Sequence, residues 1–158
     1  SAVQLFGTAT EVENKMKYEA EFGELDEPFQ RYSLLLQLAA YAPQPPCDFT
    51  TDEHLFRGCQ TKVWLSVRRM DGRPDIRITS DSMLLRGVGL VLMRLLNGLP
   101  PEEYRDLARW DIPACMGLAE MFTSQRQQGI SRLLAEIEEQ TKLREETTET
   151  GKRGTQVC

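Results

Sequence analysis

Apolar residues recur at helical spacing on both sides of a middle segment in which apolar and polar residues alternate. Spacings of three and four residues predict helices at residues 10–22, 28–41 and 82–97, and a last helix from about residue 123. Pro28 suits the first turn of the second of these helices. The last helix keeps four apolar side chains on one face: Ile130, Leu133, Leu134 and Ile137. Helices therefore make up most of the predicted structure.

The middle segment has the alternation that is typical of β-strands. Apolar side chains occupy every second position in residues 62–69 and again in residues 75–79. Asp71 and Gly72, between them, are a strong turn signal, so the two runs are expected to pair as an antiparallel hairpin. A hairpin alone is only marginally stable, and residues 54–57 are the expected third strand. The predicted fold is α+β, a small antiparallel sheet of two to three strands packed against several helices.

Length and composition indicate one globular domain followed by a tail. The chain has 158 residues, of which 41% are hydrophobic and 27% charged, as expected for a protein with a hydrophobic core. We expect a single domain over residues 1–143, with its core in residues 25–140. From residue 144 onward the sequence is polar, rich in Thr and Glu and without periodicity. Residues 144–158 are therefore predicted to form a disordered tail.

Charge is unevenly distributed along the chain. The net charge of -5 argues against a general nucleic-acid binder, which would need clustered positive charge. Residues 54–86, in contrast, carry seven basic and three acidic side chains. This electropositive segment has two interpretations. It is either a surface that docks a partner or stabilises a thiolate, or a solvated hairpin that is rich in Arg.

The sequence indicates neither membrane insertion nor export. The most apolar stretch, residues 83–96, contains Arg86 and Arg94 and is shorter than the roughly 20 residues that span a bilayer. The N-terminus has no basic segment followed by an apolar one, while Ser1 in place of Met is compatible with a removed presequence. The expected location is the cytoplasm, where the four cysteines would be reduced.

One cysteine is a candidate for thiol chemistry. Cys59 follows Gly58 in the loop that enters the first long strand. A reactive thiol needs access and stabilisation as the thiolate; Gly58 supplies flexibility, and Arg57 and Lys62 supply positive charge nearby. The same position suits a small buried side chain, which is the commoner use of cysteine beside a strand. The spacings of structural zinc sites do not fit the nearest potential ligands, Cys47, His54 and Cys59.

Three segments, in order along the chain, resemble the SufE family of sulfur acceptors, which activate cysteine desulfurases in iron–sulfur cluster assembly. Residues 58–64, GCQTKVW, resemble the family signature G-C-Q-S-x-V-W, with Thr61 in the place of Ser. Residues 80–87 resemble the helix start S-D-(S/A)…(V/L)-(K/R)-G, and residues 123–130 resemble (S/T)-P-S-R-x-(N/Q)-G-L. The likeness extends over residues 29–137, and its departures leave the thiol in place.

This resemblance implies a function for Cys59. The residue would accept sulfur as a persulfide from a cysteine desulfurase, stimulate that enzyme, and pass the sulfur to an iron–sulfur scaffold or another acceptor. Pyridoxal phosphate would be bound by the desulfurase, and no cofactor or metal is expected on this chain. The residues that the resemblance and their neighbourhood suggest for binding the partner or orienting the loop are Arg57, Gly58, Gln60, Lys62 and Arg126.

Two other functions remain open at this point. An iron–sulfur scaffold would combine Cys59 with further ligands, and the sequence shows no convincing set of them. A non-catalytic adaptor would bind a desulfurase through the basic hairpin and would not need the thiol. A stand-alone enzyme is not expected, because no nucleophile–His–Asp, Walker or Rossmann pattern is present and the chain has a single His.

Overall fold

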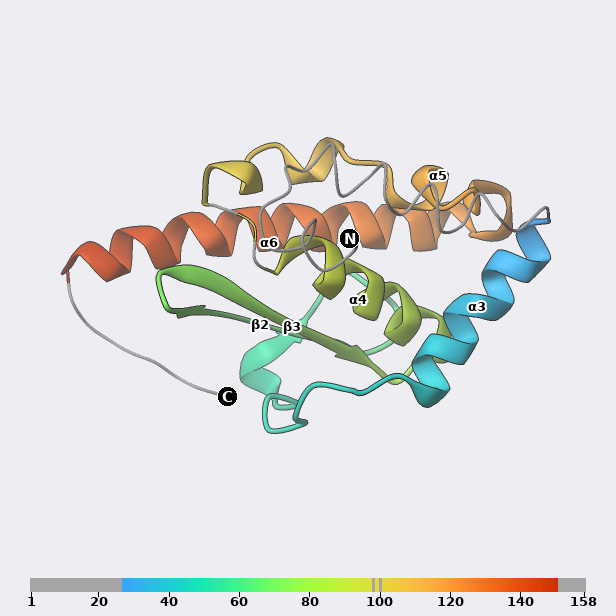
Figure 1. Cartoon of the computed structure of the whole chain (residues 1–158), viewed down its shortest axis with the longest axis horizontal. Coiled ribbons are helices and arrows are strands. Elements are labelled where there is room, and N and C mark those ends of the chain that lie inside the picture. The colour runs from blue at the N-terminus through green and yellow to red at the C-terminus, as the bar shows by residue number, and fades with distance from the viewer. Residues whose placement is uncertain (1–26, 98, 100, 151–158) are drawn as a thin grey trace.

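The computed structural model describes residues 27–97, 99 and 101–150. The helix predicted at residues 10–22 and the predicted tail residues 151–158 lie outside this part of the chain. Within it, helices pack against a three-stranded antiparallel sheet (Figure 1). The predicted α+β class is confirmed.

The sheet is a meander with the strand order β1-β2-β3. β1 (Leu55–Phe56) is short and pairs with the start of β2 (Val63–Met70), and β2 pairs along its whole length with β3 (Arg73–Ser80). Asp71 and Gly72 join β2 to β3 with φ angles of 53° and 80°. Positive φ at both positions is what a two-residue hairpin turn of this type requires. The predicted hairpin, its turn and its third strand are all found.

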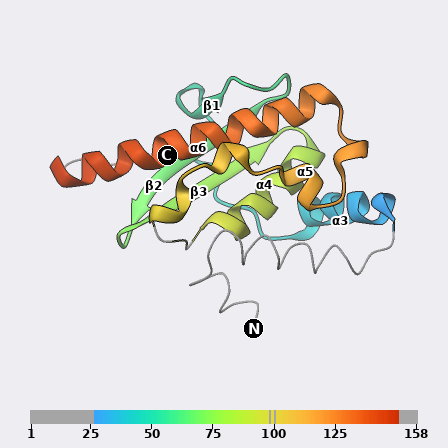
Figure 2. The same ribbon diagram turned by 90° about the horizontal axis from the view of Figure 1, so that it is seen from above.

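Two long helices cover one face of the sheet. α4 (Met83–Leu96) packs on β3, and α6 (Ser124–Thr150) packs on β2 and on the 3-10 helix η3 (Leu107–Arg109). Figure 2, the view from above, shows α6 crossing the sheet with α4 beside it. α3 (Pro28–Tyr41) has the bounds predicted for it and packs against α4.

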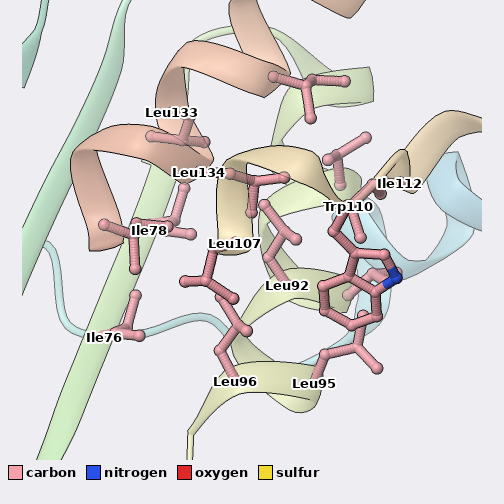
Figure 3. Close-up of a cluster of buried hydrophobic side chains, with 14 of the residues drawn as sticks. Ile76, Ile78, Leu92, Leu95, Leu96, Leu107, Trp110, Ile112, Leu133 and Leu134 are labelled. Carbon is pink, nitrogen blue, oxygen red and sulfur yellow. The ribbon is translucent and has the colours of Figure 1, made fainter. Parts of the chain in front are cut away.

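The hydrophobic core lies between the sheet and these helices. Ile76 and Ile78 extend from β3 toward Leu92 and Leu96 of α4, and Leu134 of α6 closes the cluster (Figure 3). All five side chains are almost completely buried. The alternation along the strands and the apolar stripe of the last helix therefore predicted the core-facing side chains correctly.

Two glycines let α4 approach its neighbours closely. A Cβ atom on Gly87 would overlap the backbone oxygen of Leu35 in α3, and one on Gly89 would lie 2.9 Å from Cγ2 of Ile78 in β3. Gly89 thus allows close packing on the sheet, whereas Gly87 allows close packing on a helix. This packing offsets the cost of about 1 kcal/mol that glycine carries inside a helix.

Short helical turns connect α4 to α6. They are η2 (Pro101–Tyr104), η3, α5 (Ile112–Cys115) and η4 (Ala119–Met121). The Asp111 carboxylate caps α5 by accepting a hydrogen bond of 3.1 Å from the backbone N–H of Ala114. Between α3 and β1, the predicted loop at residues 44–53 is anchored by Phe49, which is completely buried. The end of this loop forms the start of η1 (Asp52–His54).

α6 is longer than predicted. Residues 144–150 were expected to begin the disordered tail, and they are helical instead. Lack of an apolar stripe prevents packing but not elongation, because a helix that is already nucleated gains a backbone hydrogen bond with each added residue. Glu, which occupies three of these seven positions, is also a good helix former. Neither α6 nor any other described helix combines the length and the apolar character needed to cross a membrane.

Candidate functional site

The loop between β1 and β2 brings Cys59 against α6. The thiol is free and half-buried. A Cβ atom on Gly129 of α6 would lie 2.8 Å from the Cys59 Sγ atom, a distance that real Cβ contacts do not adopt. The sulfur therefore rests against a helix backbone at a position where only glycine leaves room for it. Gly129 was part of the third family-like segment, but nothing in the sequence placed it at the thiol.

The exit of the Cys59 loop is fixed by the segment that starts α4. The Lys62 carbonyl accepts a hydrogen bond of 2.7 Å from the Ser80 hydroxyl and one of 3.2 Å from the Asp81 backbone N–H. The Ser80 hydroxyl in turn accepts from the Ser82 backbone N–H at 3.0 Å. Arg86 donates two hydrogen bonds, of 3.2 and 3.0 Å, to the Ser80 carbonyl. The second family-like segment therefore acts as a brace for the loop.

The entry of the loop is held differently. A Cβ atom on Gly58 would overlap the ring of Phe56, so a larger residue here would have to displace that ring, whereas the sequence suggested that Gly58 provides flexibility. The Gly58 carbonyl accepts a long hydrogen bond of 3.5 Å from Nη1 of Arg132 in α6. The exposed side chain of Arg132 thus connects this end of the loop to the helix.

The start of α6 is also well fixed. The Thr123 hydroxyl accepts a hydrogen bond of 3.1 Å from the backbone N–H of Arg126, as expected of a helix cap. The Gln127 amide donates to the carbonyls of Ala119 at 2.7 Å and Phe122 at 3.2 Å. These bonds hold the first turn of α6, and with it Arg126, in place beside the loop.

A small cavity of about 60 Å³ opens next to the thiol. It is lined by Cys59, Gln60, Thr61, Leu85, Thr123, Gln125 and Arg126. Of the residues singled out in the sequence, the cavity therefore brings together Cys59, Gln60 and Arg126. Arg57 and Lys62 are exposed on the loop and do not line the cavity.

Burial and two arginines act on the thiol in opposite directions. Burial raises the pKa of Cys59, while the guanidinium groups of Arg126 and Arg132 lower it. Burial is the larger effect, so the pKa of Cys59 lies above its usual range. Arg57 and Lys62, which the sequence suggested as the source of positive charge, do not contribute.

Arg132 was missed by sequence reasoning, although a signal for it exists. Arg126, Gly129 and Arg132 are spaced by three residues, which places them on neighbouring positions of one helix face. Once one member of this series is known to face the thiol, the other two are expected near it.

The other cysteines are elsewhere. Cys47 is exposed in the loop before η1, Cys115 packs against the core, and Cys158 lies outside the described residues. Across the described residues, no group of three or more His, Cys, Asp or Glu side chains is placed to hold a metal ion.

Comparisons with known proteins point to one family. Residues 16–141 match the family described as "SufE: Fe-S metabolism associated domain". An uncharacterized SufE-like protein of Rhizobium etli is 30% identical over 129 residues, which are 78% of this chain and 86% of that protein. The chloroplastic SufE-like protein 2 of Arabidopsis thaliana is 32% identical over 94 residues, 59% of this chain and 36% of that protein.

The fold itself also has a counterpart among solved structures. The solution structure of a hypothetical protein from Thermus thermophilus superimposes with a TM-score of 0.63 at 21% identity, covering 84% of this chain and 96% of the other. At this level of identity the match concerns the fold alone.

Proposed function

Because this chain belongs to the SufE family, whose domain is associated with Fe–S metabolism, we propose that Cys59 accepts sulfur as a persulfide from a cysteine desulfurase. One observation carries the proposal. A free thiol sits on a braced loop, beside a small cavity and within the influence of two arginines. The two arginines favour the thiolate against the larger effect of burial, and the cavity leaves room beside the sulfur for one further atom.

The chemistry is an exchange between sulfur atoms. The Cys59 thiolate attacks the terminal sulfur of the persulfide on the desulfurase. A new S–S bond forms to Cys59 while the S–S bond of the partner breaks, and the partner's sulfur leaves as a thiolate. No oxidant or reductant is consumed, because one S–S bond replaces another. Pyridoxal phosphate belongs to the partner, where it supplies the removal of sulfur from free cysteine.

The size of the cavity agrees with the transfer of a single sulfur atom. Its volume of about 60 Å³ exceeds the roughly 10–15 Å³ that a water molecule needs. It is far below the roughly 300–1,000 Å³ of pockets that hold drug-sized ligands. A terminal sulfur atom fits this space. Arg126 and Gln60, which line it, would donate hydrogen bonds to an anionic sulfur.

Exposed cations on the loop suggest how the partner docks. Arg57 and Lys62 flank the thiol in sequence, are exposed, and do not tune its pKa. We assign them to contact with the desulfurase surface. The bound sulfur would then pass to an iron–sulfur scaffold or another acceptor, with the cytoplasm as the expected location.

The decisive experiment weighs the protein after sulfur transfer. Incubated with a desulfurase and cysteine, the wild-type chain should gain sulfur, and Cys59→Ser should fold normally and gain none. Three matched controls, Cys47→Ser, Cys115→Ser and Cys158→Ser, should each still accept sulfur. Sulfur found mainly on another cysteine would refute the assignment.

The rate of alanine release by the desulfurase separates the alternatives. A sulfur acceptor should raise this rate in a way that depends on Cys59. Stimulation that survives Cys59→Ser would favour an adaptor that acts by binding alone. A coloured iron–sulfur species on this chain without stimulation would favour a scaffold. No arrangement in the described residues favours either of these two functions over sulfur acceptance.

A further inference from the structure

Arg132 stands one helical turn beyond Gly129, the residue on which the Cys59 sulfur rests. Its Nη1 atom donates a hydrogen bond of 3.5 Å to the Gly58 carbonyl, directly before the cysteine. The two residues are 74 positions apart in the sequence. Arg132 is therefore a contact between α6 and the entry of the Cys59 loop, whose exit is braced by Ser80.

Arg126 and Arg132 flank the sulfur from one helix. Arg126 precedes Gly129 by three residues and Arg132 follows it by three, so the two guanidinium groups leave α6 one turn before and one turn after the contact with Cys59. Both lower the pKa of Cys59 and so oppose the effect of its burial. A half-buried thiol without these cations would form the reactive anion less readily.

The other charged side chains near the thiol do not act on the pKa of Cys59. Arg57 and Lys62 on the loop and Asp81 before α4 are exposed, and none of them shifts the pKa of Cys59. Arg86 of α4 is engaged with the Ser80 carbonyl. Leu85, the residue of α4 that lines the cavity, is apolar. Within the described residues, the positive field at the sulfur comes from α6.

We propose that Arg132 is a second positioning residue of the Cys59 site. Through the Gly58 carbonyl it holds the thiol against α6, and it keeps a guanidinium beside the sulfur on the other side of Gly129 from Arg126. The inference rests on the proposed function, since the anion that Arg132 stabilises is the thiolate that attacks the desulfurase persulfide.

The test measures the alkylation of Cys59 by iodoacetamide, a small neutral reagent, as a function of pH. The background is the triple variant Cys47→Ser, Cys115→Ser, Cys158→Ser, so that Cys59 is the only thiol. Arg132→Gln should slow alkylation at neutral pH by about twofold to fivefold, the range expected for one exposed charge. The rates should converge at high pH, because removal of the cation shifts the midpoint upward without blocking access.

Two further variants complete the design. Arg132→Lys keeps the charge and should return the midpoint most of the way to that of the parent. Arg94→Gln removes an exposed arginine at the far end of α4 and should leave the profile unchanged. An Arg132→Gln profile that superimposes on the parent, or one that is slowed by the same factor at every pH, would overturn the proposal, because the second result indicates a change of access alone.

This assay contains no desulfurase, so its result and the proposed function can fail separately. A chain that shows the shifted midpoint but never gains sulfur would refute sulfur acceptance and keep the electrostatic role of Arg132. A chain that gains sulfur normally but has an unchanged profile would refute the role of Arg132 and keep the function. Far-UV circular dichroism of each variant excludes loss of fold as the cause of either result.

Discussion

Gly87 in α4 and Gly129 in α6 both sit where a side chain has no room, but different groups occupy the space. At Gly87 the neighbour is the backbone of Leu35, which is completely buried between two helices. At Gly129 the neighbour is the sulfur of Cys59, a half-buried side chain on a loop. A backbone carbonyl in the core cannot move without its helix, whereas a loop side chain can. The first contact therefore serves stability, and under the proposed function the second serves the placement of the sulfur of Cys59.

Gly87→Ala should give the largest loss of stability. Alanine gains about 1 kcal/mol over glycine in a helix interior, but the new Cβ overlaps the Leu35 carbonyl. Overpacking of this kind typically costs about 1–3 kcal/mol and can cost more when backbone must move. Urea unfolding should show a net destabilisation. Gly89→Ala, whose nearest new contact is a methyl group of Ile78, is the control and should lose less; equal or raised stability of Gly87→Ala would contradict the contrast.

Gly129→Ala should show the opposite pattern, with little change in stability and a large change in function. The helix gains about 1 kcal/mol from alanine, which offsets the displacement of a loop side chain. If Cys59 accepts sulfur as proposed, displacement of its sulfur atom should lower the rate of sulfur acceptance by about tenfold or more, since misplacement of about 1 Å can cost that much. The measurements are thermal unfolding and mass after desulfurase treatment. A fall in melting temperature like that of Gly87→Ala would show that this contact is structural too.

Arg126→Ala tests whether the Cys59 site, unlike the contact at Gly87, depends on charge. Arg126 lines the cavity and lowers the pKa of Cys59, so its loss should weaken both desulfurase stimulation and alkylation at neutral pH. The expected loss in alkylation is about twofold to fivefold. Weaker stimulation with unchanged alkylation would instead place Arg126 in docking of the partner.

The smallest expected effect is a pH dependence of stability. Because burial raises the pKa of Cys59 in the folded chain, the folded state keeps its proton where the unfolded thiol, with a pKa of about 8.5, has lost it. This contribution is fully present below the pKa of the unfolded thiol and is lost as pH rises through the folded pKa. Unfolding free energies of the wild type and Cys59→Ser should therefore converge or cross between about pH 7 and about pH 10. A constant difference over that range would mean that the thiol is not desolvated.

Elements of the fold could be predicted from sequence because their causes are local. The Asp71-Gly72 turn and the alternation in β2 each depend on residues a few positions apart. The start of α4 is local too, because Ser82 accepts a hydrogen bond of 3.3 Å from the Leu85 backbone N–H. The predicted end of α6 was wrong because polarity was interpreted as disorder, although helix elongation needs no apolar face.

The site could be predicted only in part because its geometry is not local. Cys59 came from one family-like segment, and Arg126 from another. Their meeting depends on α6 crossing the sheet beside the loop, which no spacing within either segment reveals. Sequence reasoning chose Arg57 and Lys62 as the cations because they are neighbours along the chain. The cations that act on the thiol, Arg126 and Arg132, come from a helix far away in sequence.

The hairpin turn lies at the end of β2 opposite to the Cys59 loop. Val63 and Met70 are the two ends of this strand, and at about 3.3 Å per residue they are about 23 Å apart. Asp71, Gly72 and Arg73 at the tip are exposed. A peptide tag inserted there would anchor the protein to a sensor surface by the end of the sheet that lies away from the Cys59 loop. The hairpin turn is thus an attachment site for measurements of partner binding that leave every natural cysteine unmodified.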